Sequence, residues 1–198
     1  MKFRHLLGAA LLATLPGVQA AEPPATAPAA APAAAAPAAT PAPLKTVAHD
    51  RVLIAGQPGE IDLKTLREQG VTTIFNLRTE AEMSDRSVVP YDEAALAKEL
   101  DLAYVQEPIG GTDHPFRPEV LEAFKAELDR SQGKLLLHCG TGGRAGLVYA
   151  AYAVKYLGQE PDEAMRSLEA LGGWPLPLER LTGIPLKVER RGTETTDR

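Results

Sequence analysis

The sequence is poor in the features that several large classes of protein require. Its 198 residues include a single cysteine, so no disulfide can form within the chain. Lysine and arginine number 21 against 26 acidic residues, and the net charge of −5 argues against a nucleic-acid partner, whose phosphates need clustered basic side chains. The mean hydropathy of −0.14 excludes an integral membrane protein. What remains is a globular chain of one or two small domains.

The first 20 residues have the pattern of an export signal. Lys2 and Arg4 give a basic start, and the apolar stretch 6–15 is too short to span a bilayer. Small residues lie around Ala20, at the positions that signal peptidase reads. We expect cleavage after Ala20, which removes Lys2 and Arg4 and changes the net charge from −5 to −7. The mature chain is then periplasmic or secreted, without stable membrane insertion; the alternative is an uncleaved anchor.

The rest of the chain divides into a spacer, a domain and a tail. Residues 21–43 are almost entirely alanine and proline. Such a segment cannot bury a core, and its prolines favour an extended, semi-rigid and disordered linker. We expect one folded domain over residues 44–189 and a disordered tail over 190–198.

Within the expected domain, apolar strand patterns alternate with helical ones. The strand candidates are 52–54, 71–77, 102–105 and 134–138. The helix candidates are 61–69, 92–100, 118–128, 144–157 and 161–171. This alternation predicts an α/β fold, a three-layer sandwich with a mostly parallel central sheet flanked by helices.

The most informative stretch follows the strand expected at 134–138. It consists of His138, Cys139, Gly140, Thr141, Gly142, Gly143 and Arg144, and it leads directly into a helix. In open α/β sheets, ligands bind beyond the carboxyl ends of strands, and a helix N-terminus there offers free N–H groups to an oxyanion. Three glycines let those N–H groups converge on one point. Arg144 adds a planar fork that can hold two anion oxygens.

By itself the lone cysteine, Cys139, has three interpretations: a buried filler, an intermolecular link or a working thiol. The helix dipole, the loop N–H groups and Arg144 all favour a thiolate at this position, so we interpret Cys139 as a nucleophile beneath a bound tetrahedral anion. Arg144 and the loop residues 140–143 then hold the substrate, and His138 orients the loop through hydrogen bonds.

This loop resembles the phosphate loop of cysteine-based protein tyrosine and dual-specificity phosphatases. Upstream, Ala55–Pro58 and Thr73–Arg78, with Leu66–Gly70 between them, resemble the phosphatase-like domain of beta-lactamase-hydrolase-like proteins, and the resemblance covers about residues 50–172. It implies hydrolysis of phosphate monoesters through a phosphocysteine intermediate. The substrate would be a phosphorylated protein or small molecule, and no metal or other cofactor is expected.

Two positions depart from the tyrosine phosphatase pattern. Four residues separate Cys139 from Arg144, where most of those enzymes have five. The shorter loop is typical of rhodanese-type sulfurtransferases, and the beta-lactamase-hydrolase-like group shares it. Ala145 replaces the serine or threonine that often follows the arginine and helps the thiolate leave. Two alternatives therefore remain: a sulfurtransferase that carries a persulfide on Cys139, and a non-catalytic phosphate-binding module.

A phosphatase of this kind also needs a general acid for the leaving oxygen. In the related enzymes it is usually an aspartate on a loop upstream of the cysteine. The loop 110–115 offers Asp113, with His114 second and Asp92 or Glu93 as further candidates. The alternative is that Asp113 is an ordinary turn residue. For Arg78, at the end of an expected strand, we expect an ion pair with Glu80 or Glu82.

Overall fold

A five-stranded sheet lies at the centre of the computed structural model, which describes residues 43–166 and 178–185. The strands are β1 (Thr46–His49), β2 (Val52–Ala55), β3 (Val71–Asn76), β4 (Ala103–Gln106) and β5 (Lys134–His138). Their order is β1-β2-β5-β3-β4, in which only β1 runs antiparallel to its neighbour. The expected signal peptide, the tail and all of the spacer except Pro43 lie outside the described residues.

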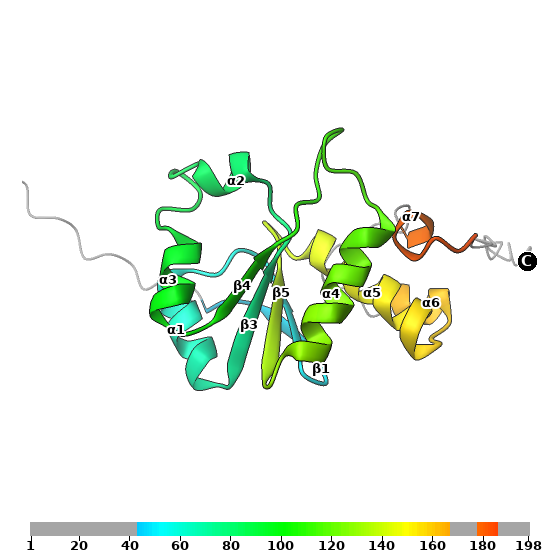
Figure 1. The fold of residues 1–198 in the computed structure, drawn as a ribbon, viewed down its shortest axis with the longest axis horizontal. Coiled ribbons are helices and arrows are strands. Elements are labelled where there is room, and N and C mark those ends of the chain that lie inside the picture. The colour runs from blue at the N-terminus through cyan, green and yellow to red at the C-terminus, as the bar shows by residue number, and fades with distance from the viewer. Residues whose placement is uncertain (1–42, 167–177, 186–198) are drawn as a thin grey trace, which may run out of the picture. The chain divides into compact units, whose positions relative to one another are not determined.

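Helices cover both faces of this sheet (Figure 1). They are α1 (Glu60–Glu68), α2 (Glu80–Ser84), α3 (Glu93–Glu99), α4 (Pro118–Arg130), α5 (Gly143–Leu157), α6 (Pro161–Arg166) and α7 (Leu178–Thr182). α1 and α3 pack on one face, and α4 and α5 pack on the other. The predicted α/β sandwich with a mostly parallel sheet is therefore confirmed. None of the helices in the described ranges is long and apolar enough to span a bilayer.

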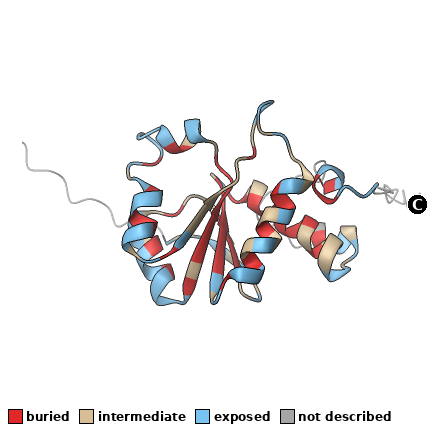
Figure 2. Ribbon diagram, in the orientation of Figure 1, coloured by how far each residue is buried: buried red, intermediate tan, exposed pale blue. Residues whose placement is uncertain are grey.

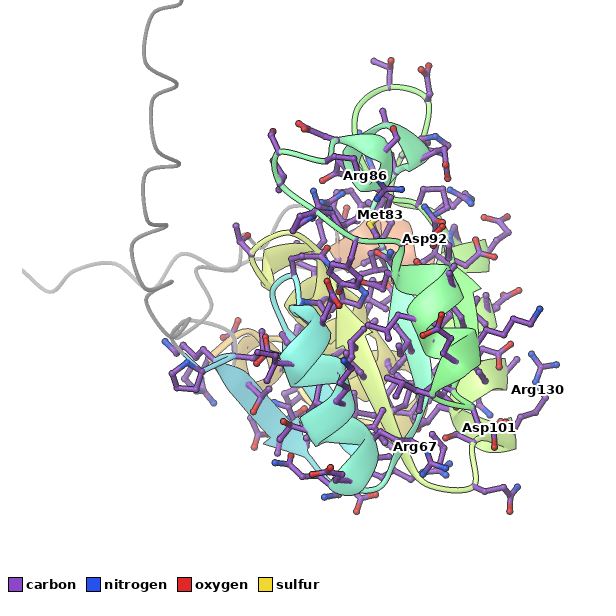
Figure 3. The ribbon with its side chains drawn as sticks, turned by 90° about the vertical axis from the view of Figure 1, so that its left-hand side faces the viewer. Arg67, Met83, Arg86, Asp92, Asp101 and Arg130 are labelled. Atoms are coloured by element: carbon purple, nitrogen blue, oxygen red, sulfur yellow. The ribbon has the colours of Figure 1, made fainter. Side chains whose placement is uncertain are left out.

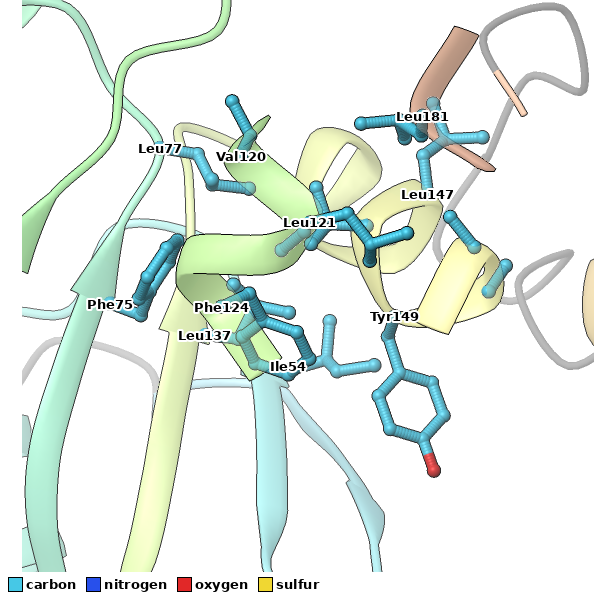
Figure 4. Packing of buried hydrophobic residues seen from close by; sticks show 14 of the residues in the cluster. Ile54, Phe75, Leu77, Val120, Leu121, Phe124, Leu137, Leu147, Tyr149 and Leu181 are labelled. Carbon is cyan, nitrogen blue, oxygen red and sulfur yellow. The ribbon is translucent and has the colours of Figure 1, made fainter. Parts of the chain in front are cut away.

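The central strands are buried on both faces (Figure 2), which explains why their sequences are continuous apolar runs rather than alternating ones. On the α4–α5 side, the ring of Phe124 packs edge-on against Phe75 and Tyr152, with centroids 5.6 and 5.4 Å away. Figure 4 shows Phe124 between Phe75, Leu121 and Leu137 in this cluster. A second cluster, which includes Leu63, packs α1 and α3 on the opposite face.

Three elements of the structure were not predicted from the sequence. β1 is a short, half-exposed edge strand, and α7 has five residues. α2 also has five residues and is defined by a capping box in which Thr79 and Glu82 satisfy each other's backbone N–H groups. Such short elements carry too little periodicity to be recognised. The helix expected at 161–171 is described as far as Arg166; its remainder lies outside the described residues.

The carboxyl ends of β2, β5 and β3 meet at one edge of the sheet. His138 is in register with Ala55 on one side and with Asn76 on the other. The three segments that resemble the phosphatases therefore emerge side by side, although they are far apart in sequence. α2 and the loop between β4 and α4 rise above this same edge (Figure 1).

Because Phe124 is fully buried between two rings, its truncation should leave a cavity in the larger core. We expect Phe124→Ala to lower the free energy of unfolding by about 3–5 kcal/mol, measured by urea denaturation. Ile61→Ala, at a side chain that is 66% exposed on α1, should change it by less than about 0.5 kcal/mol. Equal effects of the two substitutions would contradict the assignment of the core.

Candidate active site

The loop between β5 and α5 bends sharply around the thiol of Cys139. Gly142 precedes α5 with φ of 96°, a left-handed conformation that favours glycine. In this conformation its N–H points at Cys139 Sγ, with the nitrogen 3.1 Å from the sulfur. Cys139 is only 1% exposed, so the thiol lies at the base of the loop. This burial removes the interpretation of Cys139 as an intermolecular link.

Backbone hydrogen bonds fix the loop to the strands beside it. The carbonyl oxygen of His138 accepts from the N–H of Leu77, and that of Gly140 accepts from Gln57, both at 3.0 Å. Gly56 lies so close that a Cβ there would be 3.0 Å from the oxygen of Gly140. The carbonyl groups thus point outward. In the described part of the chain, the N–H groups of Gly140, Thr141 and Gly143 make no hydrogen bond and can receive an anion.

Arg144 is held by four acceptors before any ligand binds. Its Nη1 donates to Glu82 Oε2 at 2.9 Å and to the carbonyl oxygens of Leu77 and Ile109, and its Nη2 donates to Glu82 Oε1 at 2.6 Å. The Nη2 side faces the loop, because a Cβ at Gly140 would lie 3.8 Å from it. A guanidinium has five N–H donors, and within the described residues Nε and one Nη2 hydrogen of Arg144 donate to no oxygen.

The pKa values of this ion pair reflect the same contacts. Burial alone would raise the pKa of Glu82, but Arg144, Thr79 and Arg78 lower it to about 2. Burial alone would lower the pKa of Arg144, but Glu82 and the sulfur of Cys139 raise it. A carboxylate whose pKa is lowered in this way loses its charge only in strong acid. The pair is therefore intact across the whole neutral range.

A cavity of about 530 Å³ opens above Arg144. Its walls come from Thr79, Glu80, Ala81 and Glu82 on one side and from Gly110, Gly111, Thr112, Asp113 and His114 on the other. The loop is closed by the N–H of Gly110, which donates to the oxygen of His114 at 2.7 Å. The structure therefore brings Asp113 and His114 into the same cavity as Arg144. Asp113 is exposed there.

A buried carboxylate lies behind the loop. Glu93 is 1% exposed, and its Oε1 lies 2.9 Å from Nε2 of the fully buried His138. Gln57 and Asn76 donate their amides to the two carboxylate oxygens at 2.5 and 3.3 Å. The Tyr91 hydroxyl lies 3.2 Å from the carboxylate and donates its one hydrogen to the nearer carbonyl oxygen of Pro58, at 2.8 Å. Burial alone would raise the pKa of Glu93, but His138 and other hydrogen-bonding neighbours lower it. Its contribution to stability is present at neutral pH and is lost as the pH falls through that lowered value.

Arg78 joins the two upstream segments to each other. Its Nη1 donates to Gln57 Oε1 at 2.7 Å, and its backbone N–H donates to Asn76 Oδ1 at 2.8 Å. Its Nε lies 3.6 Å from Glu82 Oε1, which is one of the two ion-pair partners expected from the sequence. Neither Arg78 nor Gln57 lines the cavity above Arg144. These segments therefore fix the carboxyl edge of the sheet rather than form the wall of that cavity.

The connection from α2 to α3 sets the positions of both carboxylates. Arg86 donates to the carbonyl oxygens of Met83, Val89 and Tyr91, at 3.1, 3.3 and 2.6 Å. Figure 3 shows Arg86, Met83 and Asp92 gathered at this connection. Asp92 caps α3 by accepting from the N–H of Ala95 at 3.0 Å. The segment that follows Glu82 is thereby folded back so that Glu93 enters the interior.

Sequence reasoning singled out the loop residues and Asp113 but not every partner that the structure gives them. Glu82 was expected only as a partner of Arg78, yet it holds Arg144. Glu93 was a further candidate for the general acid; it is 1% exposed, accepts from Gln57, Asn76 and His138, and does not line the cavity above Arg144. Glu82 and Glu93 both lie outside the upstream segments that resemble the phosphatases, so no pattern in the sequence pointed to their partners. Thr141 is exposed at the tip of the loop, and Ala145 is fully buried.

Over residues 43–166 and 178–185, no group of three or more histidine, cysteine, aspartate or glutamate side chains is arranged to hold a metal ion.

Several known proteins are similar to this chain in sequence or in fold. The chain is 31% identical over 124 residues to a beta-lactamase hydrolase-like protein of Xylella fastidiosa, a match that covers 63% of this chain but only 27% of the relative. A candidate phosphatase of Shewanella putrefaciens CN-32 is 26% identical, with a TM-score of 0.54 over 71% of this chain and 88% of that one. A mutant form of Tk-PTP has the same fold, with 21% identity and a TM-score of 0.56 over 71% and 95% of the two chains.

The family comparison covers the sheet, the loop and the cavity together. The model described as "Swiss Army Knife protein, DSP-PTPase phosphatase domain" matches residues 42–173. This range contains β1 to β5 and the cysteine loop with its arginine. The chain therefore belongs to this family of DSP-PTPase phosphatase domains, and it is a phosphatase.

Proposed function

We propose that the chain hydrolyses phosphate monoesters with Cys139 as its nucleophile, through a phosphocysteine intermediate. The observation that carries the proposal is the loop itself. Cys139 Sγ receives the N–H of Gly142 at 3.1 Å, beneath backbone N–H groups that have no other partner in the described chain. These are the groups that stabilise a thiolate and bind the oxygens of a phosphoryl group.

The proposed reaction has two steps. In the first, Cys139 Sγ attacks phosphorus, an S–P bond forms, and the ester P–O bond breaks while Asp113 gives its proton to the departing oxygen. In the second, water attacks phosphorus, the S–P bond breaks and inorganic phosphate leaves. Asp113 takes the proton of that water, so that thiolate and acid are both restored. Arg144 and the loop N–H groups hold the phosphoryl oxygens throughout.

Glu82 gives Arg144 its orientation in this mechanism. Because the carboxylate and two backbone carbonyls occupy Nη1 and one edge of Nη2, the guanidinium cannot rotate freely. Its unoccupied donors are then presented to the anion without a further loss of conformational freedom, which favours binding of the transition state. Arg144 thus bridges a permanent carboxylate and a transient phosphate.

We extend the proposal to the class of the natural substrate and to the cellular compartment in which the protein meets it. The chain matches about a quarter of the length of the beta-lactamase hydrolase-like relatives, so their activity as whole proteins is not carried over. We expect a phosphorylated protein or a small phosphorylated molecule, met outside the cytoplasm after export through the signal in residues 1–20.

Cys139→Ser tests the nucleophile. The hydroxyl is far less ionised than a thiol, so hydrolysis of p-nitrophenyl phosphate should fall by more than about 10⁴-fold. Binding of phosphate, measured by calorimetry, should persist because the N–H groups and Arg144 remain. Retained turnover in this variant would exclude the mechanism. The wild-type protein should be assayed in parallel with thiosulfate and cyanide, since thiocyanate formation without phosphate release would support the sulfurtransferase alternative.

Arg144→Lys tests the bridge between Glu82 and the anion. A lysine ammonium cannot hold both acceptors with a planar fork, so inhibition by vanadate should weaken by roughly 10–100-fold. Since the pKa of Glu82 is about 2, the ratio of the two inhibition constants should be constant between about pH 5 and pH 8. Arg130→Lys, at an exposed ion pair on α4, is the matched control and should behave as wild type. Equal inhibition of Arg144→Lys and wild type would show that Arg144 does not contact the anion.

Asp113→Asn tests the general acid. The loss of kcat should be about 10²–10⁴-fold for an alkyl phosphate, whose leaving group needs a proton, and much smaller for an activated aryl phosphate. The basic limb of the pH profile should also flatten, because it would report the loss of that proton. His114→Gln, on the same loop, separates the two candidates. A small and uniform effect of Asp113→Asn, together with a large one of His114→Gln, would assign the role to His114.

A further inference from the structure

We propose that the cavity above Arg144 selects phosphate monoesters whose leaving group carries a positive charge, and that Glu80 determines this preference. The inference deepens the proposed function and rests on it, because it takes the cavity as the place of the leaving group. The phosphoryl group itself is held by the cysteine loop and Arg144, so Glu80 acts on the other half of the substrate.

The position of the cavity relative to the nucleophile makes it the place of the leaving group. Of the loop residues 139–144, only Arg144 lines the cavity, and its guanidinium also interacts with the sulfur of Cys139. In phosphoryl transfer the leaving oxygen departs on the side of phosphorus opposite to the attacking atom. Because Cys139 lies at the base of the loop, the leaving group departs outward, where α2 and the loop between β4 and α4 rise above the sheet (Figure 1).

The walls of this cavity are polar and offer little to an apolar group. Its ten lining residues include no phenylalanine, tyrosine or tryptophan, and no aliphatic side chain larger than that of Ala81. Cavities that bind apolar or aromatic groups are lined mainly by side chains of those kinds. The leaving group is therefore recognised here by charge rather than by burial of apolar surface.

Negative charge predominates on these walls. Three carboxylates, Glu80, Glu82 and Asp113, line the cavity together with one guanidinium, that of Arg144; the other titratable residue is His114. The charges of Glu82 and Arg144 match each other, at 2.6 Å. Asp113 carries a proton when the proposed reaction needs an acid. The negative charge of Glu80 is then the one that remains without a counter-charge.

Glu80 is free to pair with a ligand. It is exposed at the first position of α2, and within the described residues its carboxylate makes no hydrogen bond or ion pair. Two arginines of the same segment, Arg78 and Arg86, donate to groups of the protein itself and do not line this cavity. No other basic side chain of the segment 78–86 is available to neutralise Glu80.

This charge distribution discriminates between leaving groups. An ammonium group near the ester oxygen is attracted by Glu80, whereas a second anionic group is repelled, and such repulsion is a common basis of specificity. An ammonium group in this position occurs in two kinds of substrate: a protein with lysine beside a phosphoserine, and a small ester such as phosphoethanolamine.

The test measures binding of three two-carbon esters to the full chain with Cys139→Ser, by calorimetry at pH 7 and low salt. The leaving group is neutral in ethyl phosphate, an ammonium in phosphoethanolamine and a carboxylate in phosphoglycolate. We expect phosphoethanolamine to bind about 3–5-fold more tightly than ethyl phosphate, the effect of one partly exposed ion pair, and phosphoglycolate to bind more weakly than either. Equal dissociation constants for the three esters would overturn the inference.

Glu80→Gln in the same background assigns the preference to one residue. The ratio of the dissociation constants of ethyl phosphate and phosphoethanolamine should fall to below about 2, and about 0.5 M salt should lower the ratio in the parent protein as well. Glu60→Gln is the matched control, because Glu60 is also exposed at the first position of a helix, α1, and lies outside the cavity. A ratio that stays unchanged in Glu80→Gln would refute the role of Glu80.

Two phosphoserine peptides of equal length, with lysine or alanine beside the phosphoserine, distinguish the sources of the ammonium group. Tighter binding of the lysine peptide than of both the alanine peptide and phosphoethanolamine indicates a protein substrate. Equal binding of the two peptides, with the preference among the small esters retained, indicates a small ester. Hydrolysis is measured separately with the wild-type chain. If no ester is hydrolysed although the binding preference is present, the proposed function is wrong and the preference of the cavity stands.

Discussion

β5 is hydrogen-bonded on both sides, to β2 and to β3, and this double pairing is the constraint on which the site depends. A strand fixed on both sides cannot shift its register, so His138 must end opposite Ala55 and Asn76. The neighbouring segments then determine where the following loop is hydrogen-bonded. The N–H groups of Gln57 and Leu77 bind its carbonyl oxygens and turn its own N–H groups inward. The pairing of these strands thus fixes the backbone of the loop around Cys139 before any substrate binds.

Two carboxylates complete this arrangement from outside the sheet. Glu82, on α2, binds Arg144, and Glu93, on α3, binds His138. Each helix is short, and both belong to the crossover that connects the parallel strands β3 and β4. Both are nevertheless held in place by local devices: a capping box at Thr79, an Asp92 cap and the three carbonyl contacts of Arg86. The segment between β3 and β4 therefore supplies the counter-charges of a loop that lies more than 45 residues further along the chain.

The α/β sandwich and the cysteine loop could be predicted from the sequence, because both have strong local signals. β5 and the Gly-Arg loop are contiguous, and the apolar runs of β2 and β3 are those of strands buried on both faces. The ion pairs of Glu82 and Glu93 could not be predicted from the sequence. Nothing in the spacing of Glu82 and Arg144, or of Glu93 and His138, indicates contact, since each pair depends on how the segment 80–93 folds back. A glutamate at the start of an expected helix is exposed in most proteins, and the burial of Glu93 becomes visible only when the structure places its donors Gln57, Asn76 and His138 around it.

The near-complete burial of the only thiol also has a consequence for the chemical durability of the protein. Disulfide exchange requires two sulfur atoms to approach to about 2.05 Å, with their neighbouring carbons in a defined geometry. A cysteine that is 1% exposed, with the N–H of Gly142 on its sulfur, offers no such approach to a second protein or to a bulky thiol. The fold therefore shields its lone cysteine from cross-linking to other proteins.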